Sequence, residues 1–122
     1  MTKPLAVITG ASSGIGEATA KAFSEAGYPT LLLARRVEIM ESFNLKNSIC
    51  KKVDVRDRDA LVSAVREAEA IYGPTDMMFN NAGVARLADI STQDPNEWDE
   101  MIDVNTKGVM NGIYAVMSDM KA

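Results

Sequence analysis

The residues best suited to bind a ligand form a glycine-rich run near the N-terminus, TGASSGIG over residues 9–16. Glycine lets the backbone turn tightly and approach a ligand without a Cβ in the way. The start of a helix presents unpaired N–H groups and the positive end of its dipole, which suit a pyrophosphate. The run lacks the Gly-Lys-Ser/Thr ending of a P-loop and has Gly-x3-Gly-x-Gly spacing instead. It predicts a phosphate-binding turn, with a tight turn that only packs helix on strand as the alternative.

Two further polar segments follow predicted strands later in the chain. Asp54 and Val55 lie at the end of the third strand, where a carboxylate can accept a hydrogen bond from an adenine amino group and the next N–H can contact the ring. Residues 80–83, Asn-Asn-Ala-Gly, follow the fourth strand, where an Asn pair can hold a turn by bonding to neighbouring backbone. Taken singly, each segment is explained equally well as a cap or a turn.

Alternating strand and helix patterns position these segments. Apolar runs predict strands over residues 5–8, 30–33, 49–55 and 77–79. Helices are predicted after the glycine turn, over 37–43, from Asp57 to Tyr72, and from Asp94 toward the C-terminus. The first helix is expected to pack through one apolar face, formed by Ile15, Ala18, Ala22, Phe23 and Ala26. The alternation predicts an α/β fold: a Rossmann-type, doubly wound parallel sheet in strand order 3-2-1-4, with helices on both faces.

Composition excludes several classes of function. A length of 122 residues fits one domain, spanning 1–122. A net charge of −4 with scattered cations argues against a nucleic-acid partner. The absence of histidine excludes an imidazole zinc site and a Ser-His-Asp or Cys-His nucleophile, and we expect no metal. The single cysteine fits a reducing compartment, and neither a signal peptide nor a membrane span is apparent, so we expect a cytoplasmic protein without a membrane partner.

The three polar segments, in this order and each at a strand end, resemble the short-chain dehydrogenase/reductase family. In that family the TGxxxGxG turn, the Asp after the third strand and the NNAG segment line the dinucleotide groove. The residues 103–105, Asp-Val-Asn, match the place where the family carries its catalytic Asn. The resemblance covers essentially the whole chain, and the runs ARRVE and NEWDEMIDVN are closest to NADP(H)-dependent bacterial members. It implies hydride transfer between NADP(H) and a carbonyl or alcohol substrate.

The choice of cofactor follows from the end of the second strand, Ala34-Arg35-Arg36. Members specific for NAD place an Asp or Glu there to bind the ribose, whereas a nearby Arg accommodates the 2′-phosphate of NADP. A solvated basic pair is the alternative. The resemblance implies Asn105 as the catalytic residue. It implies as cofactor-binding residues Gly10, Ser12, Ser13, Gly14, Ile15, Gly16, Arg35, Arg36, Asp54, Val55, Asn81, Ala82, Gly83 and Val104.

The chain departs from the family in its catalytic residues. The family's Ser, and its Tyr and Lys in a YxxxK segment, follow a fifth strand, and none of them occurs in residues 1–122. Tyr114 and Lys121 have the wrong spacing and lie on the preceding helix. We therefore expect an N-terminal part of a longer enzyme, which is inactive alone and which in full-length form associates as a homodimer or homotetramer through the last helix. A noncatalytic dinucleotide-binding module stays open as the alternative; a scaffold that has lost its ligand is disfavoured by the intact motifs.

Overall fold

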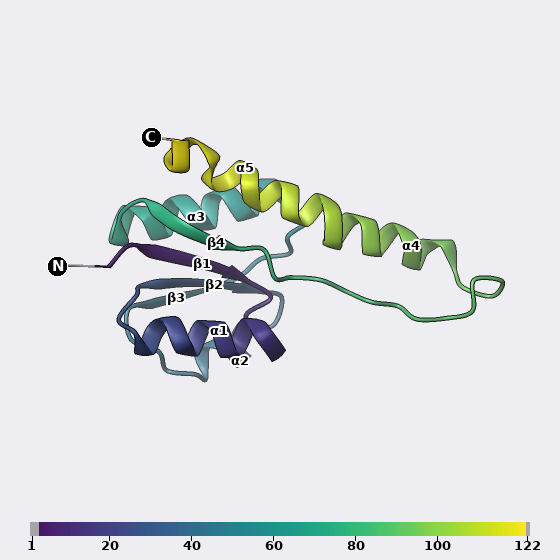
Figure 1. The fold of residues 1–122 in the computed structure, drawn as a ribbon, viewed down its shortest axis with the longest axis horizontal. Coiled ribbons are helices and arrows are strands. Elements are labelled where there is room, and N and C mark those ends of the chain that lie inside the picture. The colour runs from purple at the N-terminus through teal and green to yellow at the C-terminus, as the bar shows by residue number, and fades with distance from the viewer. Residues whose placement is uncertain (1–2, 122) are drawn as a thin grey trace.

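A central sheet of parallel strands organises the computed structural model, which describes residues 3–121 (Figure 1). The strands are β1 (Leu5–Thr9), β2 (Thr30–Ala34), β3 (Ser48–Lys52) and β4 (Thr75–Phe79), and their order is β3-β2-β1-β4. All three pairings are parallel. Every residue of β1 and β2 is buried, as the continuous apolar runs predicted. The predicted sheet and its strand order are confirmed.

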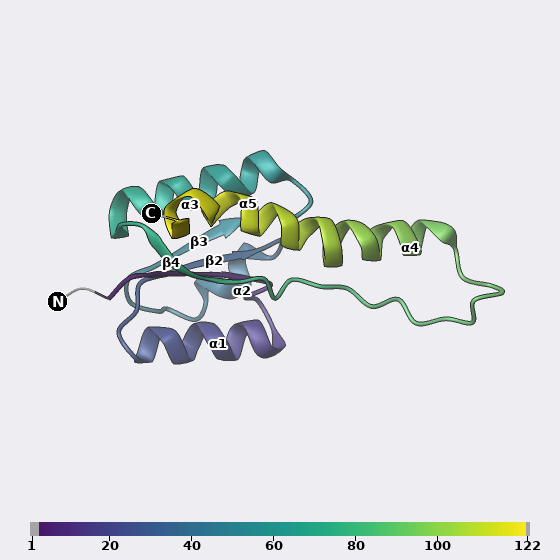
Figure 2. The same cartoon turned by 45° about the horizontal axis from the view of Figure 1, so that its top comes forward.

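Helices cover both faces of this sheet (Figures 1 and 2). On one face lie α1 (Gly14–Glu25) and α2 (Val37–Glu41), and on the other lie α3 (Arg58–Tyr72) and α5 (Gly108–Lys121). Side chains alternate between the faces along each strand. Leu31 and Leu33 of β2 therefore join the core under α3 and α5, while Leu32 joins the core under α1 and α2. The doubly wound arrangement is confirmed.

The last helix has the predicted extent but is less regular than predicted. It consists of α4 (Pro95–Ile102), a π-helical turn η1 (Asp103–Lys107) and α5, which run on without a break. The helix starts predicted at Asp57 and Asp94 are confirmed, and both side chains act as N-caps: Asp57 accepts a hydrogen bond from Ala60 N–H at the start of α3, and Asp94 accepts one from Asn96 N–H at the start of α4. In Figure 1, α4 and the loop before it project beyond the end of the sheet.

The structure corrects the packing face predicted for the first helix. Ile15 is 77% exposed, and the buried residues of α1 are Gly16 and Ala20. A Cβ at Gly16 would lie 2.1 Å from the carbonyl oxygen of Gly10, so α1 approaches the sheet through a residue that has no side chain. Of the predicted face only Phe23 is half-buried, against Phe79, and its other four residues are exposed.

The third strand also ends earlier than predicted, at Lys52 rather than Val55. Val53 N–H still donates to Ala34 O, after which the chain turns toward α3. Among residues 3–121, no helix has the length and apolar character needed to cross a membrane.

Candidate functional site

A cleft of about 670 Å³ opens at the carboxyl ends of the strands. Residues that follow each of the four strands contribute to its walls, together with one residue of η1. The lining consists of Gly10, Ser12, Ser13, Leu33, Ala34, Arg35, Arg36, Lys52, Val53, Asp54, Val55, Asn81, Ala82, Gly83, Val84 and Val104. The fold therefore brings together segments that lie up to about 90 residues apart. Four predicted site residues lie outside this lining: Gly14, Ile15, Gly16 and Asn105.

The glycines of the first turn serve different purposes. Gly10 adopts a φ of +64°, and a Cβ on it would lie 2.9 Å from Ala82 Cα. Gly16 lets the helix touch the turn, as described above. Gly14 has a φ of +56°, but a Cβ there would meet no protein atom within 4 Å. Gly10 and Gly16 are therefore needed for close packing, and Gly14 for its backbone conformation.

Thr9 joins the glycine turn to the segment after β4. Its hydroxyl oxygen accepts hydrogen bonds from the backbone N–H groups of Asn81 and Ala82, both at 3.0 Å. The side-chain amide of Asn81 donates to Gly10 O at 3.3 Å. Sequence reasoning did not single out Thr9, although a threonine at the end of an otherwise apolar strand was an available signal. These three hydrogen bonds hold the Asn-Ala-Gly segment against the glycine turn.

The start of α1 suits an anionic group. Asp57 and Asp94 cap α3 and α4, whereas the side chain of Ser13 makes no capping hydrogen bond at α1. The first N–H groups of α1 are therefore left without a side-chain acceptor beside the cleft, where the helix dipole is positive. This arrangement fits the diphosphate of a dinucleotide.

Positive charge collects at the end of β2. Arg35 and Arg36 line the cleft directly after Ala34, and within the described chain neither forms an ion pair with a carboxylate. No acidic side chain occupies the position of Ala34. Arg35 interacts electrostatically with the carboxylates of Asp54 and Glu100 but without a direct ion pair. The guanidinium groups at this rim can therefore accept a phosphate more readily than a hydroxyl.

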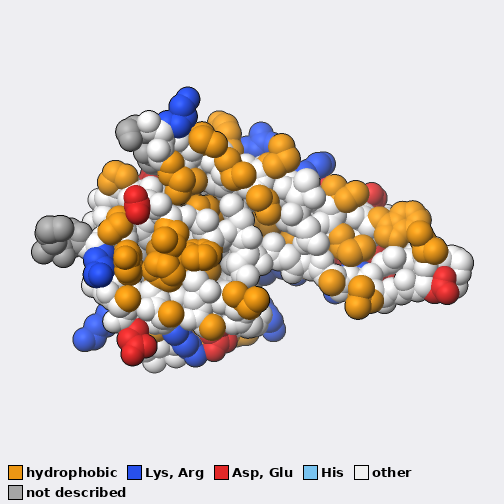
Figure 3. All heavy atoms as spheres, in the orientation of Figure 1, with side chains coloured by type: hydrophobic (Ala, Val, Ile, Leu, Met, Phe, Trp, Pro, Cys, Tyr) orange, Lys and Arg blue, Asp and Glu red, His pale blue; other side chains and the backbone are white. Residues whose placement is uncertain are grey.

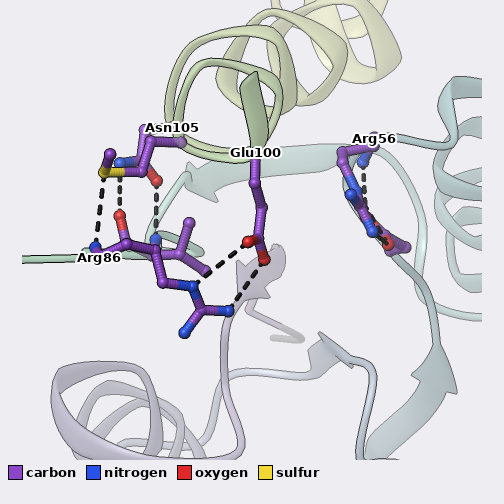
Figure 4. Close-up of polar contacts among 7 residues, drawn as sticks. Arg56, Arg86, Glu100 and Asn105 are labelled. Carbon is purple, nitrogen blue, oxygen red and sulfur yellow. Dashed lines mark hydrogen bonds and ion pairs between the residues drawn. The ribbon is translucent and has the colours of Figure 1, made fainter. Parts of the chain in front are cut away.

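Asp54, predicted to contact adenine, is bound by Arg56 (Figure 4). Its Oδ2 accepts from Arg56 Nη2 at 2.6 Å, and its Oδ1 accepts from the Arg56 backbone N–H and Nε, both at 3.0 Å. The hydrogen bonds from the Arg56 side chain hold the pKa of Asp54 below its ordinary value. Asp54 lines the cleft as an anion, but an adenine amino group would share it with Arg56, which sequence reasoning missed.

Val55, the other residue predicted to contact adenine, is fixed to α5 by a buried amide. Asn111 is only 6% exposed, and its Nδ2 donates to Val55 O at 2.8 Å. Its Oδ1 accepts from Arg58 Nε at 3.0 Å. The turn after β3 is therefore held in place from the helix behind it. Asn111 was missed because an isolated Asn in a helical pattern carries no positional signal.

Asn105 clamps the segment after β4 rather than facing the cleft (Figure 4). Its Oδ1 accepts from Val84 N–H and its Nδ2 donates to Val84 O, both at 2.8 Å. It lies within the π-helical turn η1, and single π-turns often occur at functional sites. Beyond it, Arg86 forms an ion pair with Glu100 of α4 at 3.0 Å, which holds the same loop a second time. The predicted catalytic role of Asn105 stays a prediction.

Comparison with known proteins decides the family. The family model for short chain dehydrogenases matches residues 4–122. The chain belongs to the short-chain dehydrogenase family. An uncharacterized oxidoreductase of Listeria monocytogenes is 44% identical to this short-chain dehydrogenase chain over 117 residues, which are 91% of this chain and 47% of the relative. The chain spans about half the length of the curated relatives it matches.

Two relatives with more specific names are similar to the chain. An acetoacetyl-CoA reductase of Paracoccus denitrificans is 35% identical over 119 residues, covering 96% of this chain and 49% of the relative. The solved structure of an alcohol dehydrogenase from the archaeon Thermococcus sibiricus, complexed with 5-hydroxy-NADP, superimposes with a TM-score of 0.89 at 30% identity. That match covers 97% of this chain and 53% of the archaeal one.

Proposed function

We propose that this chain is the NADP(H)-binding part of an oxidoreductase that transfers a hydride between NADP(H) and a carbonyl or alcohol substrate. The observation that carries the proposal is the rim of the cleft at the end of β2, where Arg35 and Arg36 follow Ala34 and form no ion pair with a carboxylate of residues 3–121. The archaeal neighbour that carries an NADP derivative supports the same cofactor.

Each wall of the cleft has a role in holding this cofactor. The amides at the start of α1 and the turn from Gly10 to Ser13 bind the diphosphate, Arg35 and Arg36 bind the 2′-phosphate, and Asp54 and Val55 lie against the adenine. Asn81 to Gly83, fixed by Thr9, support the nicotinamide side. NADP(H), when bound, supplies or accepts the hydride, while the protein orients it and excludes water.

Fluorescence titration of the full-length protein with NADPH and NADH tests this proposal. We expect NADPH to bind more tightly by about 1–3 kcal/mol, the scale of a charged hydrogen bond. Arg35→Ala should erase most of that preference. Lys21→Ala is the matched control, because Lys21 lies on α1, pairs with Glu17 and does not line the cleft. Equal affinities for both cofactors in the unmutated protein would refute the cofactor assignment.

A noncatalytic dinucleotide-binding module is the second candidate, because no YxxxK segment occurs within residues 1–122. Oxidation of NADPH by the full-length protein, followed at its absorbance band with a panel of carbonyl compounds, separates the two. Turnover supports the oxidoreductase, and tight binding without turnover supports the module. For the 122-residue chain alone we expect weak NADP(H) binding and no turnover.

We also propose that the full-length protein self-associates through α4 and α5. Large apolar side chains line the exposed side of these helices, and Figure 3 shows hydrophobic groups spread along them. They are Trp98, Ile102, Met110, Ile113, Tyr114 and Met117, with exposed fractions between 39% and 64%. Burying such a row against its own copy gives a symmetric, apolar interface.

A further inference from the structure

Three cations line the cleft without a carboxylate partner in the part of the chain that the structure describes: Arg35, Arg36 and Lys52. The residue next to Lys52 behaves differently, because Lys51 Nζ pairs with Glu67 Oε1 of α3 at 2.8 Å. Two adjacent lysines that look alike in the sequence thus differ in the structure. Lysines on an edge strand hinder edge-to-edge pairing with another chain, which explains why both lysines are present but not why their contacts differ.

Alternation along β3 explains why the two lysines diverge. Ile49 packs against the core under α3 and α5, and Cys50 packs against the core under α1 and α2. With a period of two, Lys51 shares the face of Ile49, and Lys52 shares the face of Cys50. Lys51 therefore reaches α3, whereas Lys52 lies on the opposite face, the side on which α2 begins.

The register between strands then brings Lys52 beside the arginines. Lys52 and Ala34 are Cα partners in the parallel pairing of β2 with β3, and each is the last residue of its strand. Arg35 and Arg36 follow Ala34 directly. Three positive charges from two neighbouring strand ends therefore meet at one rim. Asp54, two residues after Lys52, already forms an ion pair with Arg56.

We propose that Lys52 is a specificity-determining residue that binds, together with the arginine pair, the 2′-phosphate on the adenosine ribose of NADP(H). The proposal rests on the function proposed above, because it assigns a third cation to the same subsite. A phosphate monoester carries close to two negative charges near neutral pH, so a cluster of several cations matches it better than one arginine does. A lysine on an edge strand can turn toward such a group because its ammonium sits on a flexible stem.

Substitution at the two neighbouring lysines tests the proposal in the full-length protein. Lys52→Ala should weaken NADPH binding roughly three- to ten-fold, between the contribution of an exposed ion pair and that of a charged hydrogen bond. Its affinity for NADH should change less than about two-fold, because NADH lacks the phosphate. Lys52→Arg should keep most of the NADPH affinity. Lys51→Ala removes the same charge one residue away and should leave both affinities unchanged.

Competition with the cofactor's own fragments locates the contact. Lys52→Ala should weaken the binding of 2′,5′-ADP as much as it weakens the binding of NADPH, and it should leave the binding of 5′-ADP unchanged. Equal weakening of NADPH and NADH, or no change in either, would overturn the proposal. Failure of the cofactor assignment itself looks different, because then the unmutated protein would bind NADPH and NADH equally. Lys52 is exposed at the end of its strand, and circular dichroism of each variant verifies that the fold is retained.

Discussion

Replacing the two glycines at the start of α1 separates a steric requirement from a conformational one. A Cβ at Gly16 would lie 2.1 Å from Gly10 O and 2.6 Å from Asn81 Nδ2. Real Cβ atoms essentially never come within 3.0 Å of a heavy atom outside their own stretch of chain, so the helix or the turn must move by about 0.9 Å. A Cβ at Gly14 meets nothing within 4 Å, and only its φ of +56° resists substitution.

The magnitudes follow from these two geometries. Inserting a methyl group into packed backbone costs about 1–3 kcal/mol, and the gain in helix propensity of up to about 1 kcal/mol offsets only part of this. Because the overlap at Gly16 is with backbone, the upper end of the steric cost applies, about 3 kcal/mol less about 1 kcal/mol, and we expect Gly16→Ala to destabilise the protein by about 2 kcal/mol. Gly14→Ala should cost about 1 kcal/mol, because alanine disfavours the left-handed region. Gly14→Asn should cost less than Gly14→Ala because Asn tolerates that region, whereas Gly16→Asn should cost more than Gly16→Ala.

Thermal unfolding of the full-length protein, followed by circular dichroism, measures this order. Relatives are about twice as long as this chain, and for proteins of that size about 2 kcal/mol lowers the Tm by roughly 4–8 °C. The rank order is the stronger test, because asparagine should be the milder substitution at position 14 and the harsher one at position 16. A Gly16→Ala variant with an unchanged Tm would refute the close helix–turn contact.

Three other predictions concern the Asp54–Arg56 pair, the exposed face of α4 and α5, and Asn105. Arg56→Ala should raise the pKa of Asp54 toward its ordinary value. Because the pKa of Asp54 is lowered in the folded protein, the pair stabilises the fold at any pH above the unfolded-state pKa of about 3.9. That stabilisation is lost as the pH falls through the folded-state pKa. Both side chains are partly exposed, so urea titrations should show a loss below about 1 kcal/mol at neutral pH that shrinks in acid. Ile102→Asp with Ile113→Asp should shift the full-length protein to smaller species in size-exclusion chromatography with light scattering, while circular dichroism shows that the fold is retained, since both side chains are exposed in the single chain. Asn105→Ala should lower turnover far more than cofactor affinity.

The fold could be predicted from sequence because each element carries its own local signal. Buried parallel strands need continuous apolar runs, and Asp57 and Asp94 mark helix starts directly. The packing face of α1 could not be predicted in this way, because it is formed by the small residues Gly16 and Ala20, which carry little apolar signal. The predicted end of β3 was wrong because Val53 and Val55 are both buried, as strand residues would be, but belong to the turn that leads into α3.

The site could be predicted in part. Its polar segments lie at strand ends, and a parallel sheet brings those ends together whatever the side chains do. Two of the residues that were missed act through partners distant in sequence. Thr9 binds residues after β4, and Asn111 binds the turn after β3, more than fifty positions away. Lys52 depends on strand register, which a single sequence does not reveal.

For Asn105 the sequence motif identifies the residue, but only the structure shows its contact with Val84. Its amide accepts from Val84 N–H and donates to Val84 O, so both ends of the amide are used. Asn105→Asp preserves the acceptor and loses the donor, while Asn105→Ala loses both. If the hydrogen bonds of Asn105 to Val84 position the segment after β4, turnover of the full-length protein should fall in the order Asn, Asp, Ala at position 105. The affinity for NADPH should change less than about three-fold, because Asn105 lies outside the cleft. Loss of NADPH affinity in parallel with turnover would show instead that the clamp supports cofactor binding.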